Sequence, residues 1–217
     1  MMSMKPICGD EWVTSASTKY GMNRNMSSIT TSDFAVKGES GEVVLKVPST
    51  LELGPNFMKD GMNVLGSNGD AMYTLIEGLW KSSYTVYIMC GETFLATIKT
   101  TRMSTCRSYI YAGEEHFDVF NSPTSGNPPV LCMDSSAGLT YTSGLDEKAL
   151  KTRAEMHTNL KFYKGDSFDD RDMVAWTSFV ADELDDTFGL EINAGQDAAL
   201  ILAGTISAIK MMYNAGF

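Results

Sequence analysis

An uncharged run near the C-terminal end, residues 198–209, constrains the fold of this chain more than any other segment. Alanine, leucine and isoleucine side chains cover every side of a helical wheel over this run, so a helix here must be buried on all sides. The run is 12 residues long, whereas a helix that spans a membrane needs about 20. Because the preceding chain consists of short strand patterns, the sequence predicts a buried helix inside a sheet that closes around it.

The residues that frame this run support a buried helix rather than a membrane anchor. Asp197 stands immediately before it and Lys210 immediately after it. An aspartate at this position is expected to cap the helix N-terminus, because its carboxylate accepts hydrogen bonds from the free N–H groups there. Lys210 is expected near the negative end of the helix dipole.

Short strand patterns bounded by turn residues fill most of the chain from residue 26 onward. Three pairs of strands flank short Gly-containing turns and are predicted to form hairpins: residues 33–37 with 42–47, 62–65 with 71–77, and 84–89 with 93–100. Further strands are predicted at residues 106–112, 116–120, 130–133, 139–142, 154–163, 174–180 and 188–192. Such a succession is typical of a sandwich or barrel, and the apolar helix favours a closed barrel because closure removes exposed strand edges.

The length suits one large domain or two small ones, and together with the strand patterns it favours a single mainly β domain. The chain has 217 residues, and its middle lacks the composition of a linker. Residues 1–22 are rich in Ser, Thr, Met and Gly without a hydrophobic period, so they are predicted to be a poorly ordered N-terminal leader. The barrel domain is then predicted to span residues 23–217.

The charge balance disfavours nucleic acid as a partner. The chain carries 17 basic and 27 acidic residues, a net charge of −10, whereas nucleic-acid binders must neutralise phosphates. The same charge opposes attraction of the whole surface to anionic lipid, which leaves only a local basic patch for that purpose.

The cysteines and the N-terminal residues favour a cytoplasmic protein. Cys8, Cys90, Cys106 and Cys132 are widely spaced and form no metal-binding motif. The first ten residues lack the apolar core of a signal peptide. The expectation is therefore four reduced thiols in a protein that is cytoplasmic and not secreted.

Known catalytic motifs do not match the sequence. The glycines at 61 and 66 lack the lysine of a P-loop, and the Gly-Glu-Ser-Gly turn lacks the spacing of a nucleophile elbow. His116 and His157 both stand in strand patterns and are predicted to be exposed to solvent. The acidic segments 166–172 and 182–186 do not follow the spacing of a calcium loop, so solvated loops are favoured over a metal site. We therefore expect no enzymatic activity, cofactor or metal.

Three segments resemble the LURP-one-related family, whose fold is shared with tubby proteins and phospholipid scramblases. They are Phe34-Ala-Val-Lys-Gly-Glu-Ser-Gly-Glu-Val-Val-Leu-Lys-Val47, then Lys81-Ser-Ser-Tyr-Thr-Val-Tyr87 followed by Glu92-Thr-Phe-Leu-Ala-Thr-Ile-Lys99, and finally Ala194-Gly-Gln-Asp-Ala-Ala-Leu-Ile-Leu202. The resemblance spans almost the whole chain and implies a closed antiparallel barrel of about twelve strands around the C-terminal helix. The sequence departs from the family pattern at two places: Tyr84 stands where many relatives have Trp, and the helix ends at Lys210 where relatives usually have an acidic residue.

The resemblance also implies a function by binding. Tubby-like domains hold phosphoinositide head groups with Lys and Arg on one rim, and Lys99, Arg102 and Arg107 fall within nine positions here. The competing interpretation is a scatter of surface cations on outward strand positions. The leading prediction is a non-enzymatic binding or adaptor domain, peripheral at membranes and linked to signalling or defence, with lipid head groups or an unidentified protein as partner. The alternative is a scramblase-like, cation-responsive lipid-handling protein that uses the acidic segment 182–186.

Overall fold

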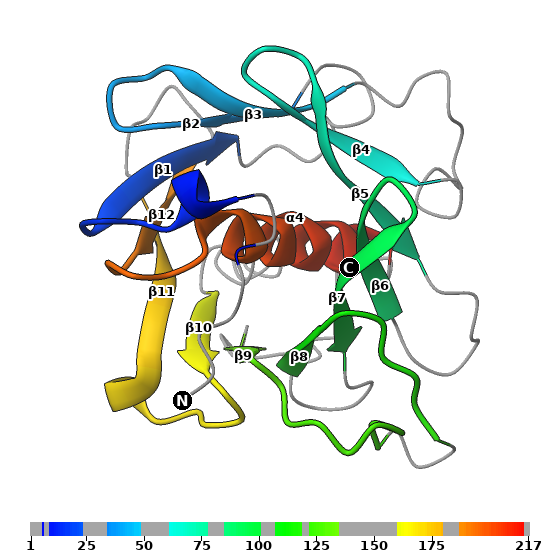
Figure 1. Ribbon diagram of the computed structural model, residues 1–217. Helices are drawn as coiled ribbons and strands as arrows, with labels where there is room; N and C mark the ends of the chain where they lie inside the picture. Colours follow the sequence, from blue (N-terminus) through cyan, green and yellow to red (C-terminus); the bar gives the residue numbers. More distant parts are fainter. Residues whose placement is uncertain are drawn as a thin grey trace, which may run out of the picture.

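The fold is a closed antiparallel β-barrel with one helix running through it (Figure 1). The computed structural model describes residues 6, 9–23, 34–48, 61–77, 85–100, 107–118, 122–134, 160–179 and 187–214. The single barrel with a C-terminal helix that the sequence predicts is confirmed.

Twelve strands make up the barrel in the described part of the chain. Their bounds are β1 Thr18–Asn23, β2 Phe34–Lys37, β3 Val43–Val47, β4 Met62–Gly66, β5 Ala71–Glu77, β6 Thr85–Cys90, β7 Thr93–Thr100, β8 Arg107–Ala112, β9 Leu131–Asp134, β10 Lys161–Lys164, β11 Met173–Phe179 and β12 Thr187–Ile192. Two single 3₁₀ turns, η1 (Asp10–Trp12) and η2 (Asp170–Asp172), and the helix α4 (Ala198–Asn214) complete the described elements.

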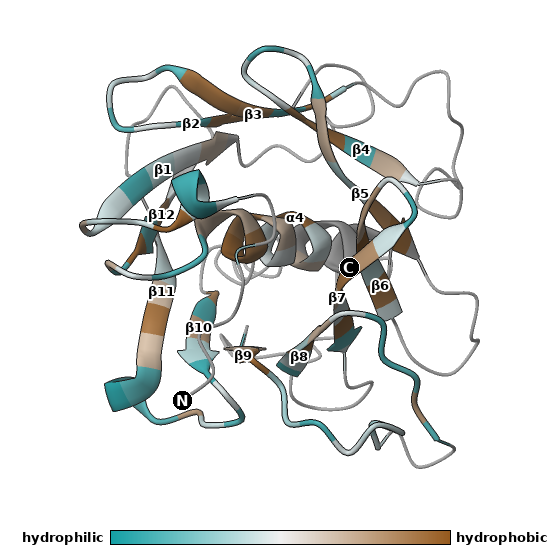
Figure 2. Ribbon diagram, in the orientation of Figure 1, coloured by the Kyte–Doolittle hydropathy of each residue, from teal (hydrophilic) through white to brown (hydrophobic). Residues whose placement is uncertain are grey.

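Each strand pairs with its neighbours in sequence, and β1 pairs with β12 to close the barrel. The closing pair runs over six residues of each strand, from Thr18 opposite Ile192 to Asn23 opposite Thr187. The three predicted hairpins are present as β2–β3, β4–β5 and β6–β7. Figure 2 shows hydrophobic residues along β3, β4 and the start of α4, and hydrophilic residues at the turns.

The barrel starts earlier in the chain than the predicted boundary at residue 23. Residues 18–22, assigned to the leader, belong to β1, and Tyr20 and Met22 are buried in the core. Thr14 attaches the preceding segment to the start of α4, because its hydroxyl donates to the carbonyl of Asn193 at 2.7 Å and its N–H donates to that of Gln196 at 3.0 Å. Thr14 and residues 18–22, all within the predicted leader, are therefore attached to the barrel.

Three other strand predictions differ from the structure or cannot be fully compared with it. Residues 116–118 form only one bridge, between Phe117 and Pro123, instead of the predicted strand 116–120. Residues 139–142 and 154–159, with His157, lie outside the described residues.

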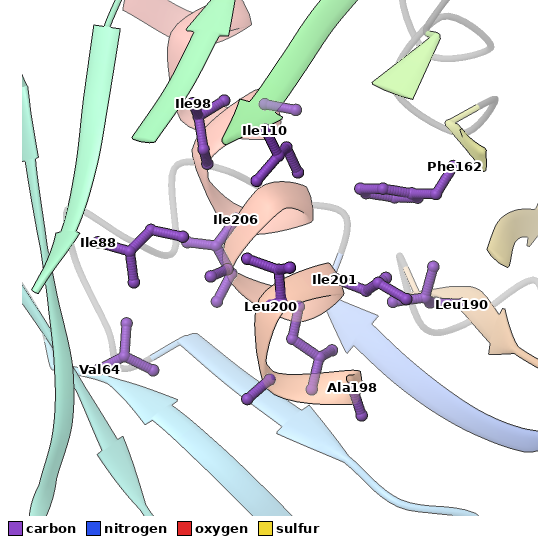
Figure 3. Packing of buried hydrophobic residues seen from close by; sticks show 14 of the residues in the cluster. Val64, Ile88, Ile98, Ile110, Phe162, Leu190, Ala198, Leu200, Ile201 and Ile206 are labelled. Carbon is purple, nitrogen blue, oxygen red and sulfur yellow. The ribbon is translucent and has the colours of Figure 1, made fainter. Parts of the chain in front are cut away.

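The helix α4 occupies the barrel interior (Figure 3). Leu200, Ile201 and Leu202 are fully buried, and Figure 3 shows inward side chains from several strands around α4. The predicted cap is confirmed, since the carboxylate of Asp197 accepts a hydrogen bond from the N–H of Leu200 at 3.0 Å. Lys210 falls within α4, which continues to Asn214.

Candidate functional site

Within the described residues, α4 and the inward side chains of the strands form the hydrophobic core of the barrel. Strand alternation separates the two faces. On β7, Ala96 and Ile98 belong to the core, so Thr97 and Lys99 point outward. The outward residues of β7 and β8 include two of the three predicted head-group residues.

Lys99 is on the expected outer face but is covered. The residue is only 4% exposed, and its Nζ atom lies 4.5 Å from the centre of the Phe117 ring. A cation over an aromatic face is stabilised by the ring quadrupole. Burial lowers the pKa of Lys99 from its ordinary value. The interpretation of Lys99 as an exposed surface cation is therefore wrong.

Arg107, on β8, is also in contact with an aromatic ring but stays partly exposed. Its Cζ atom lies 4.1 Å from the centre of the Phe168 ring, and its side chain is 39% exposed. Its Nε atom is 3.8 Å from Oδ2 of Asp134, the residue opposite it on β9. An anionic ligand at Arg107 would share this guanidinium with Asp134.

The strand register brings Lys99 and Arg107 to one region of the outer face. Lys99 is opposite Tyr109, and Arg107 comes two residues before Tyr109 on the same face. Diagonal neighbours of this kind have backbones about 7 to 8 Å apart. Arg102 lies outside the described residues, in the segment that joins β7 to β8.

Aromatic side chains surround these two cations. Tyr111 meets Phe117 edge-on, with ring centres 5.4 Å apart, and Phe168 contacts Tyr109 and Tyr163 at 6.0 and 5.7 Å. Contacts in this range stabilise aromatic pairs. These side chains form a second layer outside the barrel wall. We call them the outer cluster: Lys99, Arg107, Tyr109, Tyr111, Phe117, Tyr163 and Phe168.

Sequence reasoning missed the outer cluster, although one signal was available. On β8, Arg107, Tyr109 and Tyr111 alternate with Ser108 and Ile110, so large aromatic side chains occupy the face opposite the core. Outward aromatics at successive positions indicate that other residues cover that face, because large exposed apolar patches are rare on soluble proteins.

The remaining candidate groups have ordinary surface environments. His116 is exposed as predicted, 3.4 Å from the carboxylate of Glu114. In the acidic segment 166–172, hydrogen bonds from Arg171 hold the pKa of Asp169 below its usual value, and Lys161 lies 3.5 Å from Asp170. The acidic segment 182–186 lies outside the described residues.

The described ranges contain neither a cluster of potential metal ligands nor a helix that could span a membrane. Within those ranges, His, Cys, Asp and Glu side chains do not gather in threes that could hold a metal ion. Across the same residues, a helix with the length and apolarity needed to cross a membrane does not occur.

Comparison with known proteins supports the fold. Neither a protein-family model nor a curated protein matches the sequence. The X-ray structure of the Arabidopsis thaliana protein AT5G01750 is similar, with a TM-score of 0.56, 15% sequence identity, and coverage of 96% of this chain and 99% of that chain. At this identity the likeness shows a shared fold, and a twelve-stranded barrel around a helix fits the tubby-like architecture.

Proposed function

We propose that this chain is a LURP-one-related protein that acts by binding rather than catalysis, and that it binds phosphoinositide head groups with the outer face of β7 and β8. It would do so as a cytoplasmic protein held at the membrane periphery. The observation that carries the proposal is the placement of Lys99 and Arg107 on one outer region of adjacent strands. The segment that joins these strands contains Arg102, a third potential donor.

Several donors in one region suit a phosphorylated ring, because each phosphate oxygen can accept a charge-assisted hydrogen bond. The filled interior also favours this surface, since α4 occupies the volume that a barrel would otherwise offer to a ligand. The net charge of −10 repels an anionic membrane, so binding would depend on the local patch. We therefore expect weak binding that decreases steeply as the salt concentration rises.

The test is co-sedimentation with phosphatidylcholine vesicles that contain or lack phosphatidylinositol bisphosphate. The double variant Arg102→Ala/Arg107→Ala removes two cations from the proposed site. At about 1 kcal/mol for each cation near the surface, this change should weaken binding by about 2 kcal/mol, or roughly 30-fold.

A matched control removes two cations from another part of the barrel. Lys19 on β1 and Lys46 on β3 are solvent-exposed, and Lys19→Ala/Lys46→Ala changes the net charge by the same amount. The control should retain binding. Equal losses in both double variants would show that net charge alone governs binding, and equal sedimentation with both kinds of vesicle would refute head-group recognition.

A further inference from the structure

Lys99 is covered by a short segment that folds onto itself outside the barrel. We call residues 113–118 and 122–126 the cover segment. Its two parts run antiparallel, because the N–H of Thr124 donates to the carbonyl of His116 at 2.8 Å and the N–H of Asp118 donates to that of Ser122 at 3.0 Å. The bridge between Phe117 and Pro123 lies between these bonds. The cover segment is thus a small structural unit with its own hydrogen bonds.

The carboxylate of Glu115 holds the cover segment together. Glu115 is 3% exposed, and its carboxylate accepts hydrogen bonds from the N–H groups of His116 at 3.2 Å and Ser125 at 3.1 Å. The hydroxyls of Ser125 and Thr124 also donate to it. Burial raises the pKa of Glu115, but these hydrogen bonds outweigh that effect and lower it below its ordinary value. The carboxylate is therefore charged at neutral pH and binds both parts of the segment.

Contacts with Leu95, Thr97 and Phe117 attach the cover segment to the barrel, and the N–H of Gly113 donates to the carbonyl of Leu95 at 2.9 Å. The hydroxyl of Thr97 donates to the carbonyl of Gly113 at 2.7 Å and accepts from the N–H of Glu115 at 3.0 Å. Phe117 packs against Tyr111 and over Lys99. These contacts lie on the outer face of β7 and β8, on the side opposite the core around α4.

We infer that the cover segment is a removable lid that controls access to Lys99: docked, it hides the amine under Phe117, and undocked, it adds this cation to Arg107 for an anionic head group. The regulatory part of this inference rests on the proposed function. The structure supports it because Lys99 is nearly inaccessible while Arg107 on the next strand is partly exposed. Head-group affinity would then depend on the position of the lid.

The first experiment measures acylation of Lys99 in the folded protein by an N-hydroxysuccinimide ester, with peptide mass spectrometry. In the unmodified protein, Lys99 should react far more slowly than the exposed Lys46. Phe117→Ala should raise the acylation rate of Lys99 by at least about tenfold, because the covering ring is lost, and should leave the acylation rate of Lys46 unchanged. Phe168→Ala is the matched control, because it removes the ring over Arg107 and should leave the Lys99 rate unchanged.

A second variant, Glu115→Gln, tests the lid without removing the ring. It removes the charged hydrogen-bond acceptor at the centre of the cover segment and should also raise the acylation rate of Lys99. Circular dichroism and thermal melting establish that both variants stay folded, which we expect because neither residue belongs to the barrel core. If acylation of Lys99 stays slow in both folded variants, the inference that the cover segment is a lid is refuted.

The second experiment measures vesicle binding of the same proteins. Phe117→Ala should bind phosphoinositide vesicles several-fold more tightly than the unmodified protein, and Phe117→Ala/Lys99→Met should lose this gain. Binding that Phe117→Ala does not improve, or a gain that survives Lys99→Met, overturns the regulatory role. Absence of vesicle binding in every protein refutes the proposed function instead, and the acylation rates then still decide whether the lid exists.

Discussion

Replacing Gly204 by alanine tests how tightly α4 fits inside the barrel. Gly204 lies in the interior of α4, where alanine stabilises a helix by about 1 kcal/mol relative to glycine. Propensity alone therefore predicts a more stable protein. The structure predicts the opposite, because a Cβ atom at this position would lie 3.0 Å from Cε1 of Phe162 and 3.2 Å from Cδ1 of Ile110.

The neighbouring side chains cannot easily withdraw from the added methyl group. Phe162 and Ile110 are both fully buried, and Figure 3 shows them beside α4 on β10 and β8. Overpacking of a dense core costs about 1 to 3 kcal/mol. With the helix gain of about 1 kcal/mol subtracted, Gly204→Ala should lower the free energy of unfolding by about 1 kcal/mol. For a chain of this length the melting temperature should fall by about 2 to 4 °C.

The assay is urea denaturation of Gly204→Ala in two backgrounds, with Phe162 and with Phe162→Leu. Leucine is smaller and leaves room for the methyl group, so the glycine replacement should be neutral or stabilising in that background. The difference between the backgrounds is the coupling energy of a double-mutant cycle. If Gly204→Ala raises the free energy of unfolding by about 1 kcal/mol with Phe162 in place, or if the effects of the two changes are additive, close packing between α4 and β10 is refuted.

Two further predictions concern the core and the thiols. Leu202→Asp places a carboxylate at a fully buried position of α4, at a cost of several kcal/mol, so soluble expression with an unshifted melting temperature would contradict the buried helix. Cys90 is exposed, whereas Cys132 is buried, its thiol donates to the carbonyls of Gly165 and Ser167, and burial raises its pKa to about 12. In the native protein a thiol reagent should therefore label Cys90 rapidly and Cys132 only on unfolding, and equal rates near neutral pH would show that the second thiol is accessible.

Much of this barrel could be predicted from sequence because its hairpins and its helix carry strong local signals. The turn at Gly91 has a positive backbone angle, φ 59°, which glycine adopts readily, and strand patterns flank it on both sides. The run that forms α4 is apolar on all faces, and a helix of that kind is stable only when it is surrounded. The cap at Asp197 could also be predicted locally, because it joins residues only three positions apart.

The first strand was missed because its signal is weak and its partner is remote. Between Thr18 and Asn23, only Tyr20 and Met22 face the core, with Gly21 between them. Two apolar residues separated by a glycine do not distinguish a strand from a leader rich in small residues. What stabilises β1 is its pairing with β12 at the far end of the chain, which a local pattern cannot reveal.

The candidate site was harder to predict because strand alternation identifies a face but not what covers it. The pattern correctly placed Lys99 on the outer side of β7, yet its accessibility depends on Phe117, a residue that was itself predicted to lie in a strand. The cover segment is held by hydrogen bonds to the carboxylate of Glu115 and by one isolated bridge instead of a regular strand ladder, so no period marks it in the sequence. Residues that face the interior of such a barrel recur in the sequence with a regular period, whereas residues that cover its outer face do not. Binding residues should therefore be sought where cationic and aromatic side chains occupy successive outward positions of one strand, as Arg107, Tyr109 and Tyr111 do on β8.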